Sequence, residues 1–127
     1  MTVSLGGYMQ TILVIDDDPM NLRMAEFMLK QQGYNIITCS NGRDGISLVE
    51  SNQVDLVLLD IEMPEFNGFD TLSEIKSNSA ISSIPVIMLT ASAEKEDIEK
   101  STALGAVDYI KKPFKPQELS EIISRAI

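Results

Sequence analysis

Five short apolar segments recur along the chain, separated by stretches in which apolar residues fall at helical spacing. The first, third and fourth segments are nearly continuous Val, Ile and Leu, which is typical of strands buried on both faces of a sheet. Residues 119–127 carry an i, i+3, i+4, i+7, i+8 apolar stripe, which indicates an amphipathic helix. The segments predicted to be strands are Thr11–Ile15, Asn35–Cys39, Asp55–Leu59, Pro85–Leu89 and Ala106–Ile110.

Residues that start and stop helices lie between these segments. Asp18 followed by Pro19 predicts the N-cap and first residue of a helix, and Gly33 predicts its end. The apolar face of that helix is predicted to be Met24, Ala25, Met28 and Leu29. Strict alternation of strands and helices, with right-handed crossovers, predicts an α/β fold built on a doubly wound parallel sheet.

The composition sets the size and class of the protein. The 127 residues fit one domain, expected over residues 10–127, after an aperiodic and flexible tail at residues 1–9. Ten basic against nineteen acidic residues give a net charge of −9, which argues against nucleic acid or an anionic membrane as a direct partner. No apolar stretch is long enough for a membrane span, and no signal-peptide pattern is present. The single cysteine, Cys39, is expected to be a small buried residue, and a cytoplasmic location is expected.

The chain contains no histidine, so chemistry must rest on carboxylates, hydroxyls and lysine. In doubly wound sheets the ligand site lies beyond the carboxyl ends of the strands. Asp16 and Asp17 follow the first predicted strand, Asp60 follows the third, Thr90 the fourth, and Lys112 comes soon after the fifth. The sequence therefore predicts three acids, a hydroxyl and an ammonium around one edge of the sheet.

This set of groups suits phosphoryl transfer to a carboxylate. Mg²⁺ takes oxygen ligands and keeps several waters, so two or three carboxylates suffice to hold it. A carboxylate can attack phosphorus, and the phosphoryl oxygens then need a metal, a hydroxyl donor and a cation. Simpler interpretations remain for single residues: Asp60 as a solvated turn acid, and Thr90 or Ser92 as the cap of the following helix.

The segments ILVIDDDP, DLVLLDIEMPEFNGFD, PVIMLTA and YIKKPF resemble response-regulator receiver domains, in the family's order and spacing, from Gln10 to Ile127. The resemblance implies a flavodoxin-like receiver fold, with five helices and a five-stranded parallel sheet of order 2-1-3-4-5. It implies that Asp60 is the phosphoacceptor and that Mg²⁺, for which Mn²⁺ could substitute, is bound by Asp16, Asp17 and Asp60. The backbone carbonyl of Glu62 would be a further metal ligand.

The same resemblance assigns the remaining roles. Thr90 would contact the phosphoryl group, Lys112 would pair with it, and Tyr109 would move with Thr90. A cis bond is implied between Lys112 and Pro113, where cis costs little. The phosphoryl donor would be a histidine kinase or a histidine phosphotransfer protein. The output would be a changed surface of the fourth helix, fifth strand and fifth helix, presented to a downstream protein or, in a phosphorylation-dependent dimer, to a second copy. The resemblance implies a phosphoacceptor and not an enzyme, with at most transfer of a phosphoryl group to itself and autodephosphorylation.

Three positions depart from the family pattern. Lys115 stands where a capping residue is frequent, and Gly45 replaces a usual Ala at a cost of about 1 kcal/mol of helix propensity. Glu62 places an additional acid near the phosphoryl group, which bears on the lifetime of that group.

Other classes fit less well. A haloacid-dehalogenase phosphatase would also use an aspartate, a hydroxyl, a lysine and Mg²⁺, but it needs a further acidic motif after a later strand, and the only aspartates after Thr90 are Asp97 and Asp108. A flavodoxin-like electron carrier would need a hydroxyl-rich phosphate loop, and a receiver-like module without phosphorylation would lack one of the five site residues. The sequence leaves open whether the chain is a stand-alone receiver or part of a longer regulator or hybrid kinase.

Overall fold

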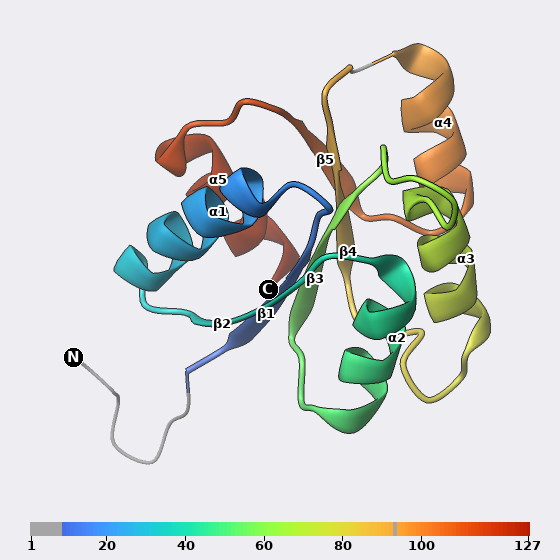
Figure 1. The fold of residues 1–127 in the computed structure, drawn as a ribbon, viewed down its shortest axis with the longest axis horizontal. Coiled ribbons are helices and arrows are strands. Elements are labelled where there is room, and N and C mark those ends of the chain that lie inside the picture. The colour runs from blue at the N-terminus through green and yellow to red at the C-terminus, as the bar shows by residue number, and fades with distance from the viewer. Residues whose placement is uncertain (1–8, 93) are drawn as a thin grey trace.

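The computed structural model describes residues 9–92 and 94–127, which form one parallel sheet covered by helices on both faces (Figure 1). The strands lie in the order β2-β1-β3-β4-β5, as predicted. The predicted tail over residues 1–9 lies outside the described residues except for Met9, so that boundary stays a prediction. The elements are β1 (Thr11–Ile15), α1 (Pro19–Gln31), β2 (Asn35–Cys39), α2 (Gly42–Ser51), β3 (Leu56–Asp60), α3 (Gly68–Ser77), β4 (Val86–Thr90), α4 (Lys95–Ala103), β5 (Asp108–Lys111) and α5 (Pro116–Ala126).

The bounds of β1 and β2 agree with the prediction, whereas β3 and β4 begin and end one residue later. Asp55, the predicted first residue of the third strand, precedes β3 in the structure. Its carboxylate accepts a hydrogen bond from the backbone N–H of Thr11, at 2.8 Å. The shift has a consequence for the site: Asp60 and Thr90 are the last residues of their strands and not loop residues. Their backbone positions are therefore fixed by strand pairing with Leu89 and Lys111, respectively.

Successive strand residues pack into two separate cores, one on each face of the sheet. Ile12 and Val14 of β1 pack beneath α1 and α5, in one cluster with Leu119 and Ile123. The intervening β1 residues face the cluster under α2 and α3. Figure 1 shows these two helix layers on opposite sides of the sheet. The central strands are apolar without interruption because both of their faces are buried.

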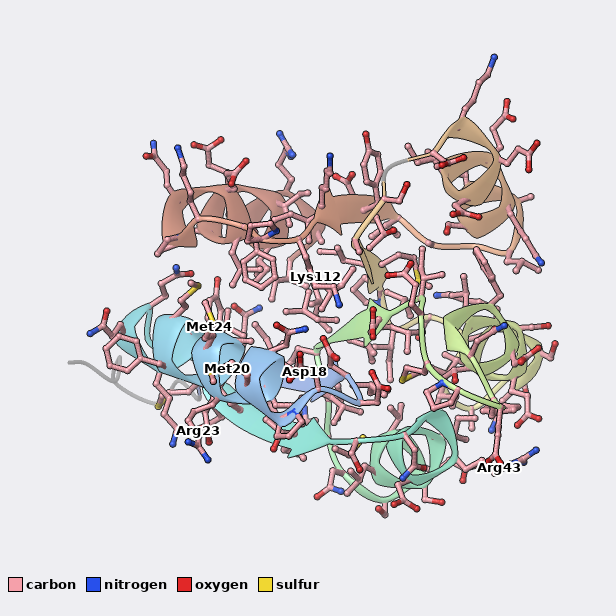
Figure 2. All side chains as sticks on the ribbon, turned by 45° about the horizontal axis from the view of Figure 1, so that its top comes forward. Asp18, Met20, Arg23, Met24, Arg43 and Lys112 are labelled. Carbon is pink, nitrogen blue, oxygen red and sulfur yellow. The ribbon has the colours of Figure 1, made fainter. Side chains whose placement is uncertain are left out.

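Helix α1 begins as predicted, with the Asp18 carboxylate accepting from Met20 N–H at 2.9 Å. Ala25 and Leu29 are fully buried, but the prediction was wrong for Met24, whose relative exposure is 45%. Met24 is one residue, and so about a quarter turn, from the Ala25–Leu29 row that contacts the sheet. It therefore falls outside the buried stripe, and Figure 2 shows it projecting from α1 with Met20 and Arg23.

The other helix ends follow the sequence pattern in part. Gly33, which was predicted to end a helix, and Gly105 follow the ends of α1 and α4 in the left-handed conformation, with φ angles of +92° and +107°. Lys115 offers no side-chain cap to α5, and Glu118 compensates by accepting from Lys115 N–H at 2.9 Å. A Cβ on Gly45 would lie 2.3 Å from Ile15 Cδ1, so the glycine lets α2 approach β1 closely.

Cys39 is half-buried and packs against the core under α2 and α3. Burial raises the pKa of its thiol to about 11, so the thiol stays protonated and unreactive at neutral pH. Within the part of the chain that the structure describes, no helix has the length and apolar character required to cross a membrane.

Candidate functional site

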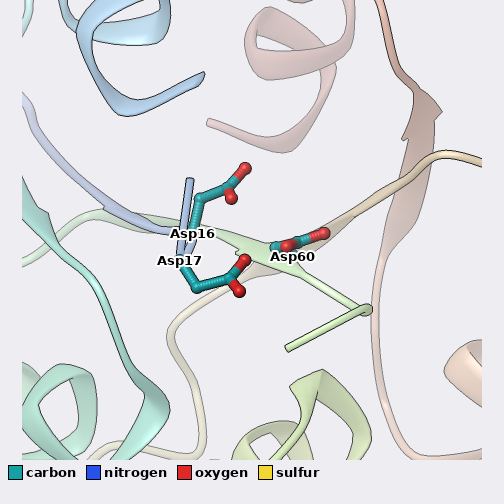
Figure 3. A group of neighbouring side chains, drawn as sticks. All are labelled: Asp16, Asp17 and Asp60. Atoms are coloured by element: carbon teal, nitrogen blue, oxygen red, sulfur yellow. The ribbon is translucent and has the colours of Figure 1, made fainter. Parts of the chain in front are cut away.

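Three carboxylates meet at the carboxyl ends of β1 and β3. Asp16 and Asp17 directly follow β1, and Asp60 ends the neighbouring strand β3, with Ile15 and Leu59 in register. One oxygen from each carboxylate lies within 4.8 Å of the others (Figure 3). Asp16 and Asp60 are each only 1% exposed, whereas Asp17 is exposed to solvent. The structure thus brings together the three acids that the sequence singled out.

Backbone contacts hold these carboxylates in place. Asp16 Oδ1 accepts from Asp18 N–H at 3.0 Å, and Asp16 N–H donates to Cys39 O at 3.2 Å. On the other side, a Cβ on Gly68 would lie 2.3 Å from the carbonyl oxygen of Asp60. Gly68 therefore permits a close approach between the start of α3 and the end of β3, a requirement that the sequence reasoning missed.

The ammonium of Lys112 links two of the acids. Its Nζ lies 2.9 Å from Asp60 Oδ1 and 3.3 Å from Asp16 Oδ2. Lys112 follows β5, and its backbone N–H donates to Thr90 O at 2.7 Å, which extends the pairing of β5 with β4. The bond between Lys112 and Pro113 is cis, which confirms that prediction. The Lys112 side chain is thereby held beside the buried carboxylates, where its ammonium neutralises part of their charge.

Asp60 and Lys112 shift each other's pKa values. Burial raises the pKa of Asp60 to about 7; the hydrogen bond from Lys112 lowers it, and the charges of Asp16 and Glu62 raise it. Burial lowers the pKa of Lys112, but the hydrogen bond and charge of Asp60, with the charge of Asp16, outweigh this and leave it raised. The lysine is thus held charged, while Asp60 is crowded by like charges that a further cation would offset.

Thr90 and Glu62 form a second polar cluster beside the acids. Glu62 Oε2 accepts from the Thr90 hydroxyl at 3.1 Å, and Glu62 Oε1 accepts from Ala91 N–H at 3.0 Å. Thr90 Oγ1 also lies 2.6 Å from Ser92 O and accepts from Ser92 N–H. Neither Thr90 nor Ser92 caps α4, whose N-cap position is Glu94. The contacts of the Glu62 side chain were not predicted, because the resemblance assigned only its backbone carbonyl.

Tyr109, the remaining residue of the predicted set, lies on β5 in register with Met88 of β4. It is half-buried and packs against the core under α2 and α3. This position is two residues before Lys111, the strand partner of Thr90. Its movement with Thr90 stays a prediction.

The acidic cluster fits a hard divalent cation. Mg²⁺ binds oxygen at about 2.0–2.1 Å, so the ligand oxygens around one ion are separated by about 3–4 Å. The carboxylate oxygens here lie within 4.8 Å of one another, so shifts of about 1 Å or less per atom bring them to that spacing. All three candidate donors are carboxylates, the ligand type that this ion prefers. The residues therefore fit the group that the resemblance implies.

Comparison with known proteins agrees with the geometry. A family model described as the response regulator receiver domain matches residues 12–124. The response regulator SaeR of Staphylococcus aureus is 40% identical over 111 residues, covering 87% of this chain and 47% of SaeR. The chain thus spans about half the length of the curated relatives it matches.

Solved structures show the same similarity. The chemotaxis protein CheY4 of Vibrio cholerae superposes with a TM-score of 0.91 at 27% identity, over 94% of this chain and 100% of that one. The receiver domain of a signal transduction histidine kinase from Syntrophus aciditrophicus has a TM-score of 0.83 at 30% identity, over 92% of this chain and 89% of that one.

These matches give no support to the haloacid-dehalogenase alternative. Asp97, one of the later aspartates that it would need, lies within α4. Asp108 begins β5, where its carboxylate lies 3.7 Å from the guanidinium of Arg125. Among the described residues, the acidic groups close enough to share a cation are Asp16, Asp17 and Asp60.

Proposed function

The chain belongs to the response regulator receiver domain family, and we propose that it accepts a phosphoryl group on Asp60 with the help of Mg²⁺. The observation that carries this proposal is the environment of Asp60. Its carboxylate is almost fully buried at a strand end, beside two other acids and 2.9 Å from a lysine ammonium. A structural carboxylate gains nothing from such crowding, whereas a phosphoacceptor needs both a cation site and a positive side chain next to it.

The residues around Asp60 divide the work of the transfer. An ionised oxygen of Asp60 attacks phosphorus, and the bond from phosphorus to the donor breaks, so that the donor leaves with the electron pair of that bond. Asp16, Asp17 and Asp60 would hold Mg²⁺, with the backbone carbonyl of Glu62 as a further ligand; the ion supplies positive charge at the phosphoryl oxygens. Lys112, already paired with Asp60, would follow the negative charge onto the phosphoryl group.

Thr90 is proposed to contact a phosphoryl oxygen and to transmit the state of Asp60 to the surface. It ends β4, and the strand beside it carries Tyr109. A shift of the Thr90 hydroxyl toward the phosphoryl group would leave space that Tyr109 can fill. The surface of α4, β5 and α5 would then differ between the two states, and a partner with different affinities for them would respond.

Response regulators receive phosphoryl groups from histidine kinases, and we propose a histidine kinase or a histidine phosphotransfer protein as the donor. The net charge of −9 argues against direct binding of nucleic acid by this domain. The expected downstream partner is another protein or a second copy of the chain, and the expected location is the cytoplasm. Phosphorylation by acetyl phosphate in Mg²⁺, and its loss in Asp60→Asn, tests the core of the proposal.

A further inference from the structure

The side chain of Glu62 has a contact set of its own, separate from the metal-ligand role expected of its backbone. Glu62 lies two residues after Asp60 and is itself exposed, between the buried Ile61 and Met63. Its two carboxylate oxygens reach across to the end of β4, where one meets Ala91 N–H at 3.0 Å and the other meets the Thr90 hydroxyl at 3.1 Å. Two donors from consecutive residues thus converge on one anionic group.

A backbone N–H and a hydroxyl that converge in this way make a small anion subsite. Hydrogen bonds to an ionised acceptor are stronger than those between neutral groups, so any anion beside these donors competes with the Glu62 carboxylate. The proposed phosphoryl oxygens are such anions, and Thr90 is the hydroxyl that they are expected to use. The hydrogen-bond donors expected to contact the phosphoryl group are therefore already bound to Glu62 before that group arrives.

The two bonds to Glu62 differ in strength. The Thr90 hydroxyl has one hydrogen, and Ser92 O, at 2.6 Å, competes with Glu62 Oε2 for it. The Ala91 N–H points to Glu62 Oε1 and serves as the steadier of the two contacts. Release of Glu62 would free the Ala91 N–H directly. The Thr90 hydroxyl could then donate either to Ser92 O or to the incoming anion.

We propose that Glu62 is an internal competitor for the phosphoryl group: its carboxylate occupies the Thr90–Ala91 subsite at rest and must leave it when Asp60 is modified. The inference rests on the proposed function, because it assigns the displacing anion to Asp60. Glu62 is a positioning residue in this scheme and takes no part in bond making. It sets how readily the site accepts an anion, since every transfer must first break the contact with Ala91.

Variants of Glu62 that differ in side-chain length or in charge distinguish the effect of its hydrogen bonds to Thr90 and Ala91 from the effect of its negative charge. Glu62→Asp keeps the negative charge but removes one methylene, about 1.5 Å of reach, so contacts of 3.0 and 3.1 Å are lost. Glu62→Gln keeps the length and removes the charge. Glu65→Asp makes the same shortening at another exposed glutamate of the same loop and serves as the matched control. The folding of each variant is checked by its ¹H–¹⁵N spectrum.

Two measurements decide the question. The first is calorimetric titration of the four proteins with beryllofluoride in Mg²⁺, since this anion mimics a phosphoryl group on a carboxylate. Loss of one or two hydrogen-bonded contacts should make Glu62→Asp bind beryllofluoride roughly three- to tenfold more tightly than the wild type. Glu65→Asp should match the wild type. The second is the Ala91 amide resonance without any added ion, which should move in Glu62→Asp and stay in place in Glu65→Asp.

The outcomes are distinguishable. Tighter binding by Glu62→Asp, together with a moved Ala91 amide, supports the inference. A gain confined to Glu62→Gln shows that charge alone acts and overturns it, as does an unmoved Ala91 amide in Glu62→Asp. Absence of beryllofluoride binding by the wild type and every variant overturns the proposed function, and this inference falls with it.

Discussion

The Lys112 ammonium lies 2.9 Å from the Asp60 carboxylate, and both side chains are largely buried. Removing the lysine would leave Asp60 and Asp16 without their shared counter-charge. Lys112→Met should therefore lower the free energy of unfolding by about 3 kcal/mol in chelator, near the lower end for breaking a buried pair because Asp60 can take up a proton. Denaturant melts measure the loss.

Two controls sharpen this prediction. Lys111→Met changes an exposed neighbour and should have little effect on the free energy of unfolding. Millimolar Mg²⁺ should restore part of the stability of Lys112→Met, since the cation supplies charge to the same acids. A Lys112→Met protein as stable as the wild type in chelator would contradict the assigned ion pair.

The pH dependence of stability reports on Asp60. Its pKa is raised from 3.8 to about 7 in the folded protein, so the folded state holds a proton that the unfolded state releases. The stability from this group is present below about pH 4 and is lost as the pH rises through about 7. In chelator, the wild type should lose stability relative to Asp60→Asn between pH 5 and pH 8. A constant difference between the two proteins across this range, measured in denaturant, would contradict the raised pKa.

Divalent cation should stabilise the fold by offsetting the repulsion among the three acids. A ligand that binds only the folded form adds about 1.4 kcal/mol at about ten times Kd, which raises the melting temperature by several degrees for a domain of this size. Asp17→Asn removes repulsion and weakens the cation site together. It should melt higher than the wild type in chelator and gain less from Mg²⁺.

Thermal melts with and without Mg²⁺ measure both effects: the higher melting temperature of Asp17→Asn in chelator and its smaller gain from Mg²⁺. Asp18→Asn keeps the α1 cap and should keep the wild-type gain from Mg²⁺. Asp17 is not part of a cation site if its variant melts lower in chelator and gains as much from Mg²⁺ as the wild type.

The proposed switch predicts a response beyond the Asp60 loop. In the beryllofluoride adduct, ring resonances of Tyr109 and amides of α4, β5 and α5 should shift, while Tyr34, near the end of α1, should not. Thr90→Ala should keep the adduct and lose the Tyr109 response, because the hydroxyl that links them is gone. NMR spectra that change only around Asp60 in the wild type would rule out the switch.

Much of the fold could be predicted from the sequence because its signals are local. Continuous apolar runs marked the buried strands, and Asp18-Pro19 marked the start of α1. The three acids were found together because parallel neighbouring strands end at the same edge of the sheet. Burial is harder to predict at the edge of a helix's apolar stripe: Met24 borders the buried row of α1 and is exposed.

Contacts between side chains from distant segments were beyond the pattern. The reach of Glu62 to Thr90 and Ala91 depends on how the loop after β3 lies against the end of β4, and no periodicity encodes that. The role of Gly68 depends on an approach to the Asp60 carbonyl that only coordinates reveal. The raised pKa of Asp60 likewise follows from burial and neighbouring charges in three dimensions.

The most direct test of the account is whether Asp60, among the acids near this site, carries the phosphoryl group. Wild type, Asp60→Asn and Asp18→Asn are exposed equally to acetyl phosphate in Mg²⁺ and analysed by intact-mass spectrometry. The account predicts one phosphoryl adduct on the wild type and on Asp18→Asn, none on Asp60→Asn, and none on any protein in chelator. A full adduct on Asp60→Asn would contradict it.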